Sequence, residues 1–232
     1  MNEQKTKYMI MSKSEIRRAP QTLTIGENKF EGVSCFRYLG AMVFNDNDLS
    51  REIKNEIQAG NRAYFANRMI FKNRLITRNT KVKIYKTLVR PVVTFGSETW
   101  TMKRSDEDAL RVFERRILRK IYGPIKENGD WRIRYNSELE HLIGGQDIVR
   151  FIKARRIGWL GHVERMTEER MPRRILNEKF YHSRRKGRPR LRWIDEVTAN
   201  LQSMNIKDWK RKAKDQREWR RIVEEAKAHQ GL

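Results

Sequence analysis

The spacing of apolar residues changes near Asp48, and this change limits the chain to a fold that mixes strands and helices. Upstream of it, short alternating runs predict strands at residues 8–11, at residues 22–25 and within residues 30–44, where Gly40 breaks the pattern. Downstream, apolar residues recur every three or four positions from Leu49 to Tyr64, which predicts a long helix. The sequence therefore predicts an α+β chain that is predominantly α-helical.

Capping and turn residues predict where the later elements begin and end. A second helix is expected from residue 79 or 80, and Pro91 should kink or end it because its ring removes a backbone donor. Ser105 is the expected N-cap of a third helix, since three acidic residues follow it. A linker is expected next, because a Gly-Pro and an Asn-Gly pair lie within residues 122–137. Further helices are expected at residues 147–166, from Pro172, at residues 191–204 and at residues 207–229.

These expectations divide the chain into three parts. Residues 1–45 would form a small β element, and residues 46–122 would form a helical domain. Residues 123–232 would form a basic helical C-terminal domain.

The excess of positive charge points to a polyanionic partner. The formal net charge is +23 and the sequence pI is about 10.5, and self-repulsion on that scale disfavours a compact chain without a counter-charge. The charge is densest toward the C-terminus: residues 1–149 hold 28 Lys+Arg against 18 Asp+Glu, and residues 150–232 hold 24 against 11. We expect nucleic acid as the partner.

Other classes of function are disfavoured by what the sequence lacks. Cys35 is the single cysteine, which excludes an intramolecular disulfide and a multi-cysteine zinc site, and the histidines are not at ligand spacing. No apolar run approaches the roughly 18 residues of a membrane span, so no membrane partner is expected. A nuclear location is expected, because the basic run at residues 184–192 could act as an import signal. A cytoplasmic location is the alternative.

Six short motifs, taken in order, resemble one protein family. They are KTKYM at residues 5–9, FRYLG at 36–40, YKTLVRP at 85–91, GSETW at 96–100, RIGWLGHV at 156–163 and GRPRLRW at 187–193. Each motif is short, but the ordered set resembles the end of the palm, the thumb and the C-terminal region of non-LTR retrotransposon (LINE-type) reverse transcriptases. The resemblance covers nearly the whole chain. It implies that residues 1–45 are a palm remnant and residues 46–122 a thumb.

The resemblance also implies roles for residues near the N-terminus. Lys7 or Lys5 would lie near an incoming triphosphate. Tyr38, Leu39 and Gly40 would form the primer grip, the turn that supports the 3′ end of the primer. Glycine suits such a turn, because a backbone that holds nucleic acid often needs positive φ or a close approach.

Catalysis in this family depends on residues that the motifs above do not include. Such polymerases use two metal ions held by aspartates, and the family's acidic pair would lie upstream of the lysine strand. This sequence contains no adjacent aspartates. We therefore expect no catalytic residue, no cofactor, no small-molecule substrate and no polymerase activity in the isolated chain. Mg²⁺ would belong to the parent polymerase.

Two groups of cations are the predicted nucleic-acid contacts. In a thumb, the first group would lie along the template–primer, although the same pattern suits the solvated side of an amphipathic helix. The first group is Lys81, Lys83, Lys86, Arg90, Arg111, Arg115 and Arg119, and the second is Arg184, Arg185, Lys186, Arg188, Arg190 and Arg192.

The second group and one tryptophan each have two interpretations. Gly187-Arg188-Pro189 resembles the AT-hook, whose arginine enters a narrow minor groove, but Lys186 replaces an expected arginine. The alternative is phosphate contact without sequence preference. Trp131 lies in the expected linker and is the best candidate for stacking on a base, with a core position as the alternative. Core positions are expected for Trp159, Trp193, Trp209 and Trp219.

Three interpretations of function remain. The first is the nucleic-acid-binding C-terminal part of a retrotransposon RNA-directed DNA polymerase, gripping RNA, DNA or their hybrid. The second is a co-opted DNA-binding protein that uses the C-terminal region as its reader. The third is a non-functional remnant of a decayed element.

Overall fold

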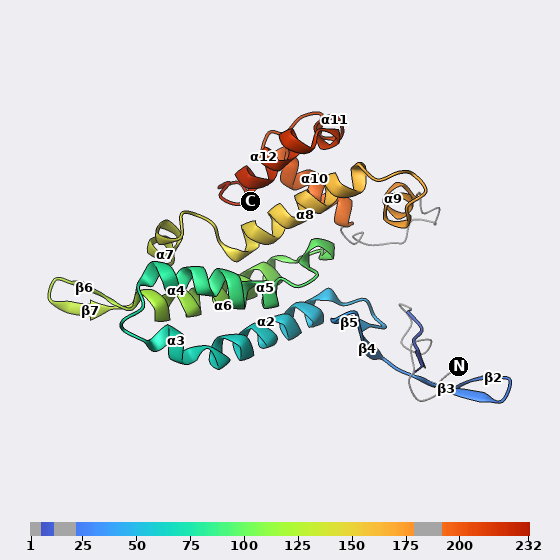
Figure 1. The fold of residues 1–232 in the computed structure, drawn as a ribbon, viewed down its shortest axis with the longest axis horizontal. Helices are drawn as coiled ribbons and strands as arrows, with labels where there is room; N and C mark the ends of the chain where they lie inside the picture. The colour runs from blue at the N-terminus through green and yellow to red at the C-terminus, as the bar shows by residue number, and fades with distance from the viewer. Residues whose placement is uncertain (1–5, 12–21, 179–191) are drawn as a thin grey trace.

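Helices dominate this protein, and three small sheets lie beside or project from them (Figure 1). The computed structural model describes residues 6–11, 22–178 and 192–232. Over these residues the fold is α+β and predominantly α-helical, as the change of apolar period predicts. No helix among them is both long enough and apolar enough to cross a membrane.

The N-terminal strands form two separate sheets. In the first, β3 (Asn28–Gly32) pairs in parallel with β1 (Lys7–Tyr8) and antiparallel with β2 (Leu23–Ile25). In the second, β4 (Cys35–Tyr38) and β5 (Ala41–Phe44) form an antiparallel hairpin. The predicted break at Gly40 is confirmed, because Leu39 and Gly40 form the turn with φ values of 49° and 96°. Both angles are positive, which suits the twist of a two-residue hairpin loop.

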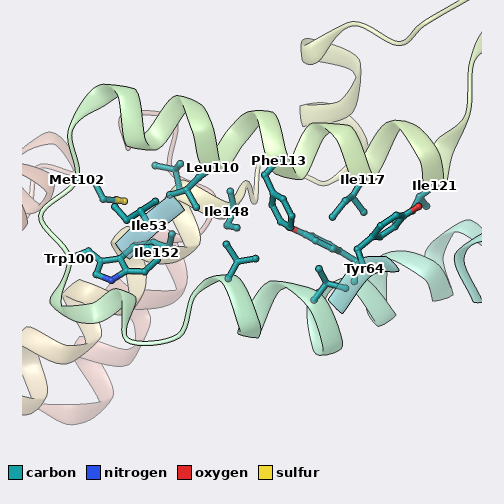
Figure 2. Packing of buried hydrophobic residues seen from close by; sticks show 14 of the residues in the cluster. Ile53, Tyr64, Trp100, Met102, Leu110, Phe113, Ile117, Ile121, Ile148 and Ile152 are labelled. Atoms are coloured by element: carbon teal, nitrogen blue, oxygen red, sulfur yellow. The ribbon is translucent and has the colours of Figure 1, made fainter. Parts of the chain in front are cut away.

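The predicted long helix is α2 (Leu49–Ala66), which begins where the Asp48 side chain accepts a hydrogen bond from Ser50 N. Its apolar face joins the first hydrophobic core. Figure 2 shows Leu110, Phe113, Ile117 and Ile121 entering the same core from α6 (Arg104–Tyr122). The short helix α3 (Arg68–Lys72) follows α2 and places Phe71 against Tyr64 in this core.

Pro91 changes the type of helix without ending it. The chain runs from α4 (Arg78–Ile84) through a π-helical turn, η1 (Tyr85–Val89), directly into α5 (Arg90–Val93). A proline has no N–H and its ring clashes with the carbonyl four residues earlier. A π turn accommodates both effects, because its hydrogen bonds join residues five apart and so leave room for the ring.

Two predictions near α6 differ from the structure, one for the start of this helix and one for the segment after it. Ser105 lies inside α6 and is not its N-cap; the Asp106 carboxylate instead accepts a hydrogen bond from Lys103 N at 2.9 Å. After α6, the expected linker contains a hairpin of β6 (Ile125–Glu127) and β7 (Asp130–Arg132). Asn128 and Gly129, with φ values of 52° and 95°, make its turn.

The C-terminal part packs around one helix, α8 (Ile148–Glu164), whose N-cap is Asp147. The short helices α7 (Asn136–Leu142) and α9 (Met171–Asn177) flank it in sequence, and Pro172 lies in the first turn of α9 as predicted. The helix expected at residues 207–229 is two helices, α11 (Trp209–Lys214) and α12 (Gln216–Ala226). Asp215 separates them because its carboxylate caps α12, accepting hydrogen bonds from Arg217 N and Glu218 N.

Trp219 is the centre of the second hydrophobic core, which joins α8 to α10 (Trp193–Ser203), α11 and α12. Its ring is buried and its Nε1 donates to Ile157 O at 2.9 Å. Trp193 and Trp209 pack against this core while partly buried, and Trp159 is also partly buried. The first residues of α8 lie in the first core and its later residues in the second. The two cores therefore share α8.

A buried ion pair connects four segments around the first core. Glu114 on α6 is only 2 % exposed and accepts hydrogen bonds from Arg90 Nη2 at 2.7 Å and Tyr85 Oη at 2.9 Å. Its other oxygen accepts from Ile148 N at 2.7 Å, one of the unpaired N–H groups at the start of α8. Burial lowers the pKa of Arg90, but its interactions with Glu114 and Tyr85 together outweigh that effect and the net shift is upward. The Arg90 guanidinium is therefore charged.

Candidate nucleic-acid interface

The first predicted group of cations divides sharply by exposure. Lys81 is 8 % exposed and Arg90 is 4 % exposed, so neither side chain can reach a phosphate. We therefore remove both from the predicted nucleic-acid contacts. Both residues lie on a helix, as predicted. However, α4 packs against α6, and Arg90 forms an ion pair with Glu114.

The other members of this group differ in how far they are engaged. Arg111 binds Asp147 and Glu107, and Arg119 donates to Asn136 Oδ1 and Arg134 O.

Lys86 is half-buried and donates a hydrogen bond to Gln146. Burial, and then Arg90, lower its pKa. Lys83 is exposed, and Arg115 is half-buried. The side chains of these two residues have no hydrogen bond or ion pair within residues 6–11, 22–178 and 192–232.

A run without acidic residues supplies stronger candidates that the motif-based prediction missed. No Asp or Glu occurs between Glu56 and Glu98, and the run contains Arg62, Arg68, Lys72, Arg74, Arg78, Lys81, Lys83, Lys86 and Arg90. The first five are exposed; they lie from the end of α2, through α3, to the start of α4, and we call them the α3 corner. None forms an ion pair with another residue that the structure describes. The absence of nearby acids was visible in the sequence.

Aromatic and apolar side chains lie among the cations of the α3 corner. Lys120 on α6 places its Nζ 4.9 Å from the ring centroid of Tyr64 and 5.4 Å from that of Phe65. Phe65, Met69 and Leu75 are largely exposed. A surface that combines free cations with an exposed ring and exposed apolar side chains suits a partner with phosphates and bases.

A second set of free cations lies on α11 and α12, across the molecule from α3 (Figure 1). The inner side of α12 is fixed by Trp219, Ile222 and Ala226, which are buried in the second core. The opposite side is therefore exposed and lines an open hollow. We call the exposed cations of this region the α11–α12 face: Lys207, Lys210, Arg211, Lys214, Arg217, Arg220 and Arg221. None of the seven forms an ion pair in the part of the chain that is described.

The second predicted group lies mostly beyond what can be described. Arg184, Arg185, Lys186, Arg188 and Arg190 lie outside the described residues, as does the AT-hook-like segment. Arg192 is described, is exposed and lies at the N-cap of α10.

The predicted primer-grip turn is exposed at the tip of the β4–β5 hairpin. Tyr38 and Leu39 are largely exposed. Gly40 lies against the Phe95 ring, since a Cβ built there would be 2.8 Å from Phe95 Cε1. Lys7 forms an ion pair with Glu31 on the neighbouring strand, and Lys5 lies outside the described residues.

Glu52 on α2 holds this hairpin, and a second buried carboxyl group lies beside it. Glu52 accepts a hydrogen bond from Met42 N at 2.9 Å, and Glu56 lies one turn further along the helix. Burial, followed by the neighbouring Glu52 carboxylate, raises the pKa of Glu56 to about 7, against the opposing effects of Arg37 and Arg62. Burial also raises the pKa of Glu52. This pair makes the stability of the hairpin dependent on pH.

We expect Glu56→Gln to reduce the loss of stability as pH rises. Because the pKa of Glu56 is higher in the folded state than its ordinary 4.5, its contribution is fully present below about pH 4.5 and is lost as pH rises through about 7. Urea unfolding at about pH 5 and about pH 8 measures the difference. The exposed Glu225→Gln is the control, and equal pH dependence in wild type and Glu56→Gln would contradict this account.

Comparison with known proteins gives one match. The chain is 24 % identical over 201 residues to a putative transposon-derived protein of Caenorhabditis elegans, covering 84 % of this chain and 72 % of that protein. This similarity supports a transposon origin. No protein-family model matches the chain, and no solved structure matches it. Among the described residues, no three His, Cys, Asp or Glu side chains gather as a metal site.

Proposed function

We propose that this chain binds nucleic acid and serves as the gripping part of a transposon-encoded reverse transcriptase. The α3 corner is the observation that carries the proposal: five exposed cations without ion-pair partners among the described residues, in a run that has no acidic residue. A free cation on a protein surface is available to replace a counterion on a phosphate. The transposon-derived relative and the ordered polymerase-like motifs support the same proposal.

The proposal assigns binding to these residues and leaves the chemical step elsewhere. Metal-dependent nucleotidyl transfer needs closely placed carboxylates, and this sequence has no adjacent aspartates. Tyr38, Leu39 and Gly40 would contribute to the grip on the primer, and Lys7 would lie near the triphosphate. RNA, DNA and their hybrid are all candidate ligands, because phosphate contacts carry no sequence information.

The salt dependence of binding tests this function. If about six to ten phosphates are engaged, log affinity should fall with log salt at about −0.9 per phosphate on duplex. Removing two contacting cations with Lys72→Ala/Arg74→Ala should make that slope shallower by about two. Fluorescence anisotropy with labelled duplex, hybrid and single strands measures both quantities.

A matched control removes the same charge from a different place. Lys54 and Arg104 are also exposed, and within the described ranges neither has an ion-pair partner, but they lie outside the acid-free run. Lys54→Ala/Arg104→Ala should therefore leave the slope unchanged. Equal changes of the salt slope in both double variants would mean that net charge alone decides binding. A slope near zero in the wild type would contradict the proposed function.

The α11–α12 face favours a second candidate, a co-opted DNA-binding protein that reads DNA with its C-terminal region. Seven exposed cations lie there, in the part of the sequence with the densest positive charge. If Arg217→Ala/Arg221→Ala weakens duplex binding while the α3-corner variant does not, this second candidate replaces the first.

A further inference from the structure

The β6–β7 hairpin projects from the helical body beyond the end of α6 (Figure 1). Trp131 on β7 is 69 % exposed, which is unusual for a side chain with so much apolar area. Its ring contacts no other ring, and its Nε1 has no hydrogen-bond partner among the described residues. The hairpin therefore presents a free aromatic surface to solvent.

The base of the hairpin is held rigidly, so Trp131 is held away from the core. Arg132 donates to both oxygens of Glu138 at 2.9 and 2.7 Å, and its guanidinium lies 4.3 Å from the ring centroid of Tyr135. Arg134 donates to Gly123 O at 3.1 Å. These contacts fix the strand that carries Trp131, so a ligand does not have to order the backbone when it binds.

The strand register places a cation beside the exposed ring. Lys126 is the cross-strand partner of Trp131, and directly opposite residues project from the same face of an antiparallel pair. Lys126 is exposed and has no ion-pair partner in the described ranges. Glu127 and Arg132, which alternate with these residues along the strands, form an ion pair with each other. The Trp131 face thus combines a ring with a free positive charge.

The base of the hairpin also lies near Arg78, one residue of the α3 corner. Burial raises the pKa of Tyr122 at the end of α6, and Arg134 from the hairpin base and Arg78 from the α3 corner both oppose that shift. Both guanidinium groups therefore lie near the same phenol.

We propose that Trp131 stacks on an unpaired base of single-stranded RNA or DNA while Lys126 binds an adjacent phosphate. This inference rests on the proposed function and adds a ligand class to it. A duplex hides its base faces, whereas a single strand offers a π face and a phosphate within one nucleotide. The adjacent cation favours this ligand over a purely apolar protein surface.

Anisotropy with the full chain tests the inference on short oligo-dA, oligo-rA and a matched duplex. Stacking on one base contributes about 1–3 kcal/mol, so Trp131→Ala should weaken single-strand binding by about tenfold and leave duplex binding within about twofold. Trp131→Phe should retain most of the affinity because it keeps a ring. Lys126→Ala should make the single-strand salt slope shallower by somewhat less than one. The two oligonucleotides show whether RNA or DNA is preferred.

Ile133 supplies the matched control, because it follows β7 and is 71 % exposed but is aliphatic. Ile133→Ala should bind single strands like the wild type. Intrinsic fluorescence adds a second readout, since single strands should quench the wild type more than Trp131→Phe. Far-UV circular dichroism should show that every variant is folded.

The possible failures are distinguishable. If Trp131→Ala binds single strands as tightly as wild type, the stacking inference is overturned and the proposed function stands. Equal losses in Trp131→Ala and Ile133→Ala, or equal losses on single strands and duplex, overturn it as well. If the wild type binds none of the three probes, both the inference and the proposed function are overturned.

Discussion

Replacing Glu114 with alanine is expected to lower the free energy of unfolding by about 3–5 kcal/mol, the usual cost of breaking a buried ion pair. The carboxylate accepts hydrogen bonds from Arg90, Tyr85 and Ile148 N. Without it, the Arg90 charge stays buried with only Gln146 O as an acceptor at 3.0 Å. The start of α8 also loses its hydrogen bond to Glu114 of α6, so the helix that the two cores share is held less tightly.

Urea denaturation followed by circular dichroism measures this change. Glu114→Gln keeps an acceptor but removes the charge, so its loss should be smaller. Arg90→Met in the Glu114→Ala background should recover part of the stability, because no charge is then left unpaired. The surface variant Glu225→Ala is the control and should change the stability by less than about 0.5 kcal/mol. A loss below about 1 kcal/mol in Glu114→Ala would show that the pair is not buried as described.

Two glycines of α8 should respond in opposite directions to the same substitution. A Cβ on Gly161 would lie 2.0 Å from Trp219 Nε1, whereas a Cβ on Gly158 would lie 3.8 Å from Val223. Gly161→Ala should therefore destabilise the protein by about 1–3 kcal/mol, because it over-packs the second core. Gly158→Ala should stabilise it by about 0.5–1 kcal/mol, because alanine favours the helix and finds ordinary packing space.

The same unfolding experiment compares both glycine variants. Near-UV circular dichroism should also change for Gly161→Ala, since the buried Trp219 ring must move and its hydrogen bond to Ile157 O must lengthen. Destabilisation of equal size in both variants would show that backbone effects, and not the contact with Trp219, decide the outcome.

Local patterns predicted α2 because burial of one face imposes a helical period on its apolar residues, and an apolar run broken at Gly40 predicted the strands of the β4–β5 hairpin. The β6–β7 hairpin was interpreted as a linker for the opposite reason. Its strands have no buried face, so they carry no alternating apolar pattern, and only the Asn128-Gly129 pair signalled a turn. The break at Asp215 was missed although the apolar spacing changes there: Ala213 and Trp219 are six positions apart, whereas the spacing on either side is three or four.

The sequence predicted the class of partner at the candidate interface but only some of the residues that form it. The excess of cations and the order of the motifs indicated a nucleic-acid partner, and the acid-free run between Glu56 and Glu98 was open to inspection. The α11–α12 face was not among the predicted contacts, since it depends on which side of α12 faces α8. Trp131 was a candidate with two interpretations, and the structure places it in solvent.

By itself the sequence determined the α+β class, the helical period, the turn residues and the total charge, because each depends on residue type and near neighbours. Tertiary structure alone decided which cations are free. Lys81 and Lys83 lie on the same helix two residues apart, yet α6 covers the first and leaves the second exposed. Arg90 likewise meets Glu114 from 24 residues away in sequence. Exposure is set by packing between distant segments, and no local pattern contains that information.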